Sequence, residues 1–133
     1  MIDHLFVYGT LQPGESRWQF LEPFVHGVGF ADSVPGRLFD TGLGYPAAAM
    51  SQAVDAVEPS SAVIKGHTFE LVAESLEVAL RTLDDVEGSV RGLYRRVEVV
   101  TTRGTRAWAY EYGADPADDL ELRPLAGGDW LRR

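Results

Sequence analysis

Glycines interrupt the strand-like segments of this chain more often than flat β-strands allow. Segments 25–33 and 35–41 both have the apolar character of strands, yet glycines lie within them and directly after them. These glycines are Gly27, Gly29, Gly36, Gly42 and Gly44. In a β-rich domain, such glycines mark bulges, bends and barrel corners. We therefore predict a closed or strongly curved sheet rather than an open sandwich.

Further segments are predicted to be strands because they are apolar or alternate between apolar and polar residues. They are 4–8, the start of 47–62, 63–71, 94–101 and 106–112. Residues 113–133 show no regular pattern and are predicted to wrap the surface irregularly.

Segment 75–85 is predicted to be the main helix, and a shorter helix is expected near 18–24. Four apolar residues of the main helix recur at helical spacing and form its buried stripe, namely Leu76, Ala79, Leu80 and Leu83. Ser75 is expected to cap the N-terminus of this helix, and Gly88 to follow its C-terminus. Several strands and one long helix predict the α+β class, and the length of 133 residues predicts a single domain, 1–133.

The composition excludes several classes of function. The formal net charge is −8 at pH 7, and nucleic acids and anionic membrane surfaces are bound by clustered Lys and Arg instead. The chain has no cysteine, which excludes disulfides, thiolate catalysis and iron–sulfur clusters. We therefore expect no nucleic acid and no membrane among the partners, and expect a small, weakly charged or zwitterionic ligand.

The histidines give no indication of a metal centre. His4, His26 and His67 lack metal-ligand spacing, so we predict no metal site and no cofactor. The first residues lack the features of a signal peptide, and no apolar run approaches the ~18 residues of a membrane span. A cytoplasmic location is the expectation that follows.

Glu87 continues the buried stripe of the main helix. It lies four residues after Leu83 and seven after Leu80, so on a helix it points within about 20° of Leu80. Burial, the negative end of the helix dipole and the nearby Asp84 and Asp85 would all raise the pKa of its carboxyl. A raised pKa moves a glutamate toward the range that is useful for general acid–base catalysis.

A simpler interpretation of Glu87 stays open on this evidence. The helix would end at Asp85, and the Glu87 carboxylate would then be solvated or would pair with Arg91 or Arg95. A local rule broken at one position suggests function without proving it.

The turn Tyr8-Gly9-Thr10-Leu11 is the second informative feature. It follows an apolar strand, and a glycine there permits a ligand to approach the backbone closely. Backbone N–H groups turned outward make a concavity that suits a carboxylate or another anion. The alternative is an ordinary exit from a strand into a turn.

These two features belong to a series of four sequence blocks that resembles the γ-glutamylcyclotransferase-like family. The blocks are Val7-Tyr8-Gly9-Thr10-Leu11 with Pro13-Gly14, then Gly36-Arg37-Leu38-Phe39 with Gly44-Tyr45-Pro46-Ala47, then 63–71, and finally Leu83-Asp84-Asp85-Val86-Glu87-Gly88 followed by Tyr94-Arg95-Arg96-Val97-Glu98-Val99. The Tyr-Gly-Thr-Leu form is similar to the short branch that contains γ-glutamylamine cyclotransferase and the plant avirulence-induced proteins. It departs from the Tyr-Gly-Ser-Asn-Leu form of the branch that acts on γ-glutamyl dipeptides.

The resemblance implies a small mixed β-barrel of about five to seven strands, with one main helix and flanking short helices. It implies that Glu87 is the catalytic acid and base, and that Tyr8, Gly9, Thr10 and Leu11 bind the substrate. Tyr45, Tyr94 and Tyr112 are candidate walls of the pocket, although each could equally be a core aromatic residue.

The implied reaction converts a γ-glutamyl amine or amide to 5-oxoproline and a free amine, without metal or cofactor, by attack of the substrate's own α-amine. Two alternatives are a non-catalytic barrel that binds a small molecule, and a cyclotransferase specialised for a γ-glutamyl-protected biosynthetic intermediate. The sequence leaves the amine part of the substrate and the oligomeric state open.

Overall fold

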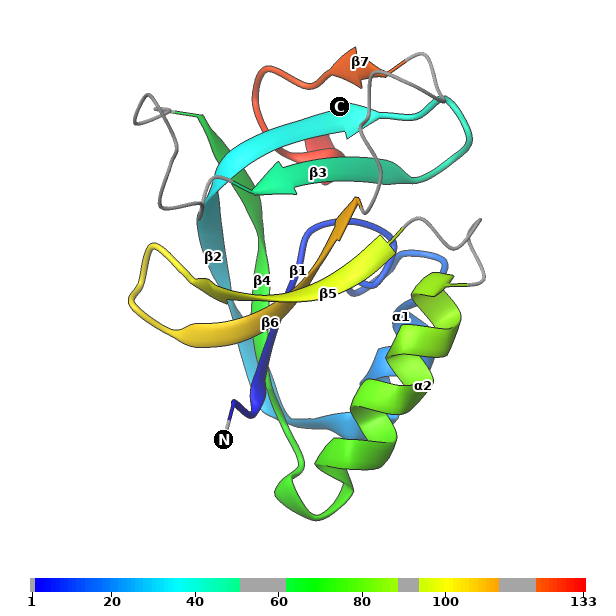
Figure 1. Cartoon of the computed structure of the whole chain (residues 1–133), viewed down its shortest axis with the longest axis vertical. Coiled ribbons are helices and arrows are strands. Elements are labelled where there is room, and N and C mark those ends of the chain that lie inside the picture. Colours follow the sequence, from blue (N-terminus) through cyan, green and yellow to red (C-terminus); the bar gives the residue numbers. More distant parts are fainter. Residues whose placement is uncertain (1, 51–61, 89–93, 113–121) are drawn as a thin grey trace.

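The computed structural model of the chain describes residues 2–50, 62–88, 94–112 and 122–133, and in this part the strands form one curled sheet (Figure 1). The strands are β1 (His4–Val7), β2 (Val25–Asp40), β3 (Pro46–Met50), β4 (Val63–Leu71), β5 (Tyr94–Val100), β6 (Arg106–Tyr112) and β7 (Arg123–Pro124). Their order is β3-β2-β4-β1-β6-β5, with β7 paired to β2. Only β1 and β6 pair in parallel, so the described sheet is mixed. The predicted α+β class and curved, barrel-like sheet are confirmed.

β2 is one continuous strand of 16 residues, where the sequence suggested two segments. Its first part pairs with β4 up to Pro35, and its last part, from Gly36, pairs with β3. A Cβ atom on Gly36 would lie 2.5 Å from the carbonyl oxygen of Ala49 in β3. The glycine therefore does not break the strand, because its lack of a side chain lets β2 pass from one part of the sheet to the other.

The helices are α1 (Trp18–Leu21) and α2 (Leu76–Gly88), with 3₁₀ turns η1 (Glu22–Phe24), η2 (Ala73–Ser75) and η3 (Trp130–Arg132). α2 lies along one side of the curled sheet (Figure 1). The helix continues to Gly88, beyond the predicted end at residue 85 and through the residue expected to follow it. Ser75 does not cap α2 as predicted, because it belongs to η2, where its hydroxyl donates to the Val72 carbonyl at 3.5 Å.

The buried residues form two clusters, one on each face of β1. Phe6 and Tyr8 pack with Val34, Leu38, Ile64, Val99 and Trp130 inside the curl of the sheet. Leu5 and Val7 point the other way and pack with residues of the helices, including Leu21, Leu76 and Leu83. Successive side chains of a strand point to opposite faces, so β1 holds both clusters together. The turn that follows β1 is therefore built on a strand whose last three residues are buried.

The C-terminal residues are more ordered than the sequence predicted. Segment 113–133 was expected to be irregular and superficial, but β7 pairs with β2 and the side chain of Trp130 is fully buried. The backbone N–H of Lys65 donates to Gly128 O at 2.7 Å, and that of Leu125 donates to Leu38 O at 2.8 Å. The prediction failed because a single buried indole, with no periodic neighbours, leaves no pattern in the sequence.

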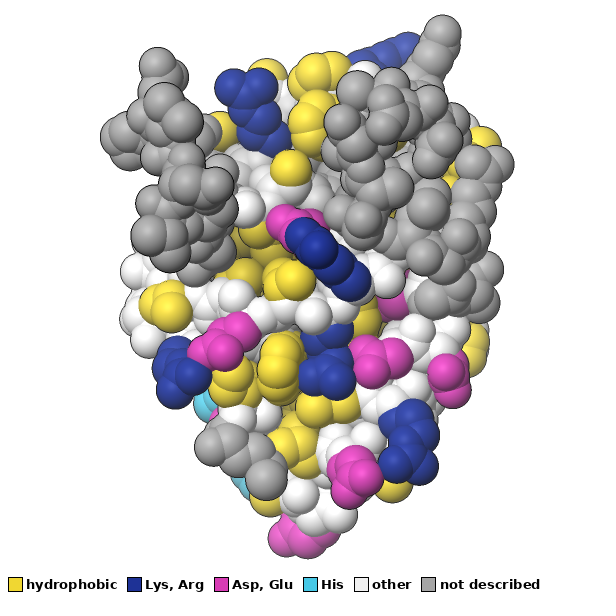
Figure 2. Space-filling view, viewed as in Figure 1, with side chains coloured by type: hydrophobic (Ala, Val, Ile, Leu, Met, Phe, Trp, Pro, Cys, Tyr) yellow, Lys and Arg dark blue, Asp and Glu magenta, His cyan; other side chains and the backbone are white. Residues whose placement is uncertain are grey.

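A shallow apolar groove lies between the start of α2 and the β5–β6 hairpin. Leu76, Leu80 and Trp108 line it, and hydrophobic side chains are visible on this face among mixed acidic and basic ones (Figure 2). The groove shares no lining residue with the cavity at the end of β1 that is described below. Within the described residues, no helix has both the length and the hydropathy needed to cross a membrane.

Candidate active site

A cavity opens where β1 ends, and it encloses about 310 Å³ of empty space, part of it open to solvent. Its walls come from the end of β1 with its turn, the start of β3, the end of α2, and the β5–β6 hairpin. The lining residues are Phe6, Val7, Tyr8, Gly9, Thr10, Leu11, Pro46, Glu87, Tyr94 and Tyr110. The structure thus brings the turn 8–11 and Glu87 together, as the sequence analysis proposed for a substrate site.

Backbone hydrogen bonds to the loop that follows hold the turn 8–11 in place. Gly9 O accepts the backbone N–H of Gln12 at 3.1 Å, and Thr10 O accepts that of Arg17 at 2.8 Å. The N–H groups of Gly9, Thr10 and Leu11 have no acceptor within the part of the chain that the structure describes. Buried backbone donors are nearly always paired in folded proteins. Unpaired donors on a cavity wall therefore mark a place that suits an oxygen atom of a ligand.

The close approach of Pro46 leaves no room for a side chain at position 9. A Cβ atom on Gly9 would lie 2.6 Å from Cγ of Pro46, the first residue of β3. Any larger residue would push the turn and the opposite wall of the cavity apart or close the space between them.

Glu87 is buried on the stripe that the helical spacing predicted, with an exposed fraction of 7%. Its Oε2 lies 3.5 Å from Nη1 of Arg17, a residue 70 positions earlier in the chain. Burial raises the pKa of the Glu87 carboxyl from 4.5 to about 7, and the positive charge of Arg17 acts in the opposite direction. The desolvation of the charged form therefore outweighs the ion pair.

The simpler interpretation of Glu87 is wrong for the described residues. The helix does not end at Asp85, the carboxylate is not solvated, and Arg95 pairs with Glu111 instead, at 2.8 Å. Arg91 lies outside the described residues.

The expected contribution of acidic neighbours to the Glu87 pKa is also corrected. Asp84 accepts the hydroxyl of Tyr110 at 2.7 Å and pairs with Arg96 at 2.9 Å. Asp85 is exposed. Neither is a cause of the raised pKa, which follows from burial.

Of the three tyrosines predicted to line the pocket, Tyr94 does so. Its hydroxyl donates to Pro46 O, which joins β5 to the start of β3. Tyr45 is buried behind the wall with its ring centroid 6.2 Å from that of Tyr94, and it is not among the lining residues. Tyr112 ends β6 opposite Tyr94, and its side chain lies outside what the structure describes.

The sequence analysis missed Tyr110, Pro46 and Arg17. Tyr8 donates its hydroxyl to Tyr110 O, and burial raises the pKa values of the Tyr8 and Tyr110 hydroxyls. Both phenols therefore stay neutral and provide no competing base. The alternation of β6 could have pointed to Tyr110, whereas Arg17 follows a turn and no periodic pattern identifies it.

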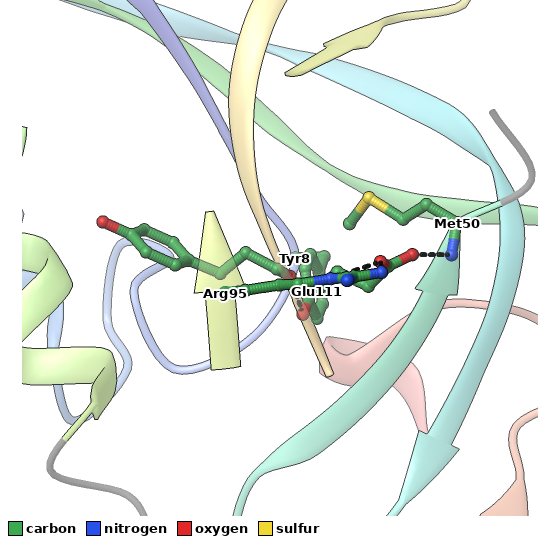
Figure 3. A network of polar contacts seen from close by, with 5 residues as sticks. Tyr8, Met50, Arg95 and Glu111 are labelled. Atoms are coloured by element: carbon green, nitrogen blue, oxygen red, sulfur yellow. Dashed lines mark hydrogen bonds and ion pairs between the residues drawn. The ribbon is translucent and has the colours of Figure 1, made fainter. Parts of the chain in front are cut away.

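Glu111 fixes the far wall of the cavity. Its carboxylate lies between the guanidinium of Arg95 and the backbone N–H of Met50, as Figure 3 shows, with a distance of 2.9 Å to the Met50 nitrogen. β3 and β6 are not neighbours in the strand order, so this side-chain contact bridges the gap between them. The bridge holds β3, and with it Pro46, against the hairpin.

The chemistry that these residues can perform is proton transfer. Among the described residues, no group of three or more His, Cys, Asp or Glu could hold a metal ion. One buried carboxylate with a pKa near neutrality can accept a proton and return it at neutral pH. The unpaired amides beside it can stabilise a negatively charged oxygen.

Comparisons with known proteins identify the family. A family model described as gamma-glutamyl cyclotransferase, AIG2-like, matches residues 5–132. The gamma-L-glutamyl-butirosin B gamma-glutamyl cyclotransferase of Niallia circulans is 31% identical over 128 residues, which cover 90% of this chain and 72% of that protein.

Solved structures share the fold. An uncharacterised protein of Pyrococcus horikoshii superposes with a TM-score of 0.68 at 21% identity, over 99% of this chain and 92% of that one. An AIG2-like protein of Mus musculus superposes with a TM-score of 0.57 at 18% identity, over 87% and 81% of the two chains.

Proposed function

Because the chain belongs to the gamma-glutamyl cyclotransferase, AIG2-like family, we propose that it converts a γ-glutamyl amine or amide to 5-oxoproline and a free amine. The observation that carries the proposal is the buried carboxylate of Glu87, which faces the same cavity as the turn 8–11. A family of this kind acts on a small molecule, and the described cavity opens to solvent where such a molecule could enter.

The substrate supplies its own nucleophile, so the protein has to fold the γ-glutamyl chain and move protons. Glu87 takes a proton from the α-ammonium, and the freed lone pair attacks the γ-carbonyl carbon. A carbon–nitrogen bond forms and closes the five-membered ring. Glu87 then gives its proton to the leaving nitrogen as the original amide bond breaks. The ring nitrogen loses its second proton to solvent, where the released amine becomes protonated.

The turn 8–11 acts on the oxygen atoms of the substrate. As the α-amine attacks, the γ-carbonyl oxygen gains negative charge, and the unpaired N–H groups of Gly9, Thr10 and Leu11 belong to residues that line the same cavity as Glu87. Donors fixed before the reaction stabilise such an oxyanion without having to reorganise.

A panel of γ-glutamyl amides tests the proposal, with 5-oxoproline and glutamate both measured as products. We expect 5-oxoproline, because a free α-amine is the nucleophile. N-acetyl-γ-glutamyl amides should not react, because acylation removes the lone pair that closes the ring. Glutamate as the main product, or cleavage of the acetylated substrate, would show hydrolysis instead. Binding of γ-glutamyl compounds without any turnover would identify a non-catalytic binding protein.

A second candidate function rests on the Niallia circulans relative, whose name gives γ-L-glutamyl-butirosin B as its substrate. In this version the γ-glutamyl group is a protecting group on a biosynthetic intermediate, and the same reaction removes it. Comparing kcat/KM for γ-glutamyl amides of small alkylamines and for γ-L-glutamyl-butirosin B separates the two. A preference of about 100-fold or more for the butirosin derivative would favour deprotection.

A further inference from the structure

Arg17 lies beside Glu87, directly before α1. The backbone N–H of Arg17 donates to Thr10 O at 2.8 Å, so the residue is tied to the turn that lines the cavity. Its side chain is 21% exposed, and its Nη1 lies 3.5 Å from Oε2 of Glu87. Arg17 therefore connects the two parts of the candidate active site.

The ion pair between Arg17 and Glu87 is incomplete. Arginine and carboxylate commonly form two parallel hydrogen bonds of about 2.7–2.9 Å, but here a single contact of 3.5 Å is present. Within the described part of the chain, the guanidinium makes no other hydrogen bond or ion pair, so most of its five N–H donors are unused. A half-buried guanidinium with unused donors can accept a second anion.

The substrate of the proposed function carries such an anion next to the group that Glu87 must meet. The α-carbon of a γ-glutamyl compound bears both an ammonium and a carboxylate. When the ammonium reaches Glu87, the carboxylate comes within a few ångströms of the same place. Arg17 is the cation that influences Glu87 there, whereas the cation at Asp84, Arg96, is already paired.

We propose that Arg17 binds the α-carboxylate of the γ-glutamyl substrate, and that it exchanges its contact with Glu87 for a paired contact with the substrate. The proposal rests on the proposed function and identifies the α-carboxylate as the substrate group that the enzyme recognises. Arg17 is not among the residues that line the cavity, so the proposal requires its guanidinium to move toward the cavity when the substrate binds.

The exchange also prepares Glu87 as a base. The groups that face Glu87 are Arg17 before α1, Tyr8 after β1 and Tyr110 on β6, and both tyrosines stay neutral. When Arg17 moves to the substrate, the α-ammonium replaces it as the cation beside Glu87. The carboxylate therefore keeps a positive partner until it takes the proton from that partner.

Two substrates that differ only in the α-carboxylate test the proposal. A γ-glutamyl alkylamide carries it, and the corresponding 4-aminobutanoyl alkylamide lacks it but keeps the amine and the carbonyl that form the ring. We expect Arg17→Ala to lower kcat/KM for the first substrate at least about tenfold, mainly through KM, and to change the second less than about threefold. Arg17→Lys should retain part of the activity on the first. Arg81→Ala, which removes an exposed arginine from α2, is the control and should change neither.

Equal losses on both substrates would overturn the proposal, because Arg17 would then act only through Glu87. Calorimetric binding of 5-oxoproline and of 2-pyrrolidinone gives a second measurement that needs no turnover. Arg17→Gln should weaken binding of 5-oxoproline selectively, and unchanged binding would also overturn the proposal. Failure of the wild-type chain to form 5-oxoproline would instead reject the proposed function and leave the binding comparison to decide the role of Arg17.

Discussion

Trp130 donates its indole N–H to the carboxylate of Glu15 at 3.1 Å, although the two residues lie 115 positions apart. The Trp130 side chain is fully buried in the core inside the curled sheet. Glu15 lies in the loop between the turn 8–11 and Arg17, where its backbone N–H donates to Gln12 O at 3.0 Å. The C-terminal segment therefore anchors the loop that carries Arg17 to the core.

Removing the Glu15 carboxylate should loosen this anchor. Glu15→Ala leaves the buried indole N–H of Trp130 without its acceptor, which we expect to lower the free energy of unfolding by about 1–3 kcal/mol. Glu15→Gln keeps an oxygen acceptor and should recover most of the loss. Urea unfolding at neutral pH measures both variants, and equal stability of the alanine and glutamine variants would show that the hydrogen bond contributes little.

The second prediction concerns the catalytic role of Glu87. Glu87→Gln keeps the size and hydrogen-bonding capacity of the side chain but cannot transfer the proton. We expect turnover to fall by at least about 100-fold, with the fold intact by circular dichroism. Asp85→Asn removes an exposed carboxylate from the same helix and should leave turnover unchanged. A glutamine variant that keeps more than about a tenth of the wild-type rate would show that Glu87 is not the shuttle.

The raised pKa of Glu87 also predicts how stability depends on pH. The folded protein holds this proton up to a pKa of about 7, while the unfolded chain releases it near 4.5. Between these values the folded state binds more protons, so this carboxyl favours folding at low pH and its contribution is lost as pH rises to about 7. The difference amounts to about 3 kcal/mol.

Glu87→Gln should remove this contribution to the pH dependence. Relative to the wild type, the variant should gain stability progressively as pH rises from 4.5 to about 7, and should hold the gain above that. Urea unfolding of both proteins at several pH values measures the difference. A constant difference across this range would mean that the pKa of Glu87 is not raised by folding.

The effect of replacing Gly9 follows from steric overlap with Pro46. Gly9→Ala places a methyl group against Pro46, where the available distance is 2.6 Å, and should destabilise the fold by about 1–3 kcal/mol. It should also lower kcat/KM at least about tenfold, because the turn donors move relative to Glu87. Gly127→Ala is the matched control, since a Cβ there meets no atom within 4 Å. A Gly9→Ala enzyme as active as the Gly127→Ala enzyme would contradict this account of the cavity.

Helical spacing was sufficient to place Glu87 on the buried face, because Leu80 and Leu83 define that face and the helix continues past residue 85. The strand segments and the curvature of the sheet were likewise local properties, readable from alternation and from glycines. The joining of segments 25–33 and 35–41 into β2 was not, because it depends on pairing first with β4 and then with β3, which lie elsewhere in the sequence.

The remaining features depend on contacts between distant residues. Arg17 reaches Glu87 across 70 positions, and Trp130 reaches Glu15 across 115. Neither Arg17 nor Trp130 belongs to a periodic stretch. Only the folded chain shows that both contacts involve the loop between the turn 8–11 and α1. The burial of Glu87 was predicted correctly, whereas its ion pair with Arg17 could not be predicted from the sequence.

The last prediction separates two tyrosines that the sequence treated alike. The hydroxyl of Tyr94 donates to Pro46 O and so links β5 to the wall opposite the turn 8–11. The hydroxyl of Tyr45 is buried, and it has no hydrogen-bond partner within the described part of the chain. Loss of a hydroxyl that leaves a carbonyl unpaired costs about 1 kcal/mol, whereas loss of an unpaired buried hydroxyl costs nothing and relieves its desolvation.

We therefore expect Tyr94→Phe to lower the free energy of unfolding by about 1 kcal/mol and to raise KM, because Pro46 is held less firmly. Tyr45→Phe should be neutral or slightly stabilising, with KM unchanged. Both variants keep the aromatic ring, so the edge-to-face contact between the two rings is preserved in each. A Tyr45→Phe enzyme with a raised KM would mean that the Tyr45 hydroxyl meets the substrate, and the unpaired oxygen behind the wall would then belong to the binding site.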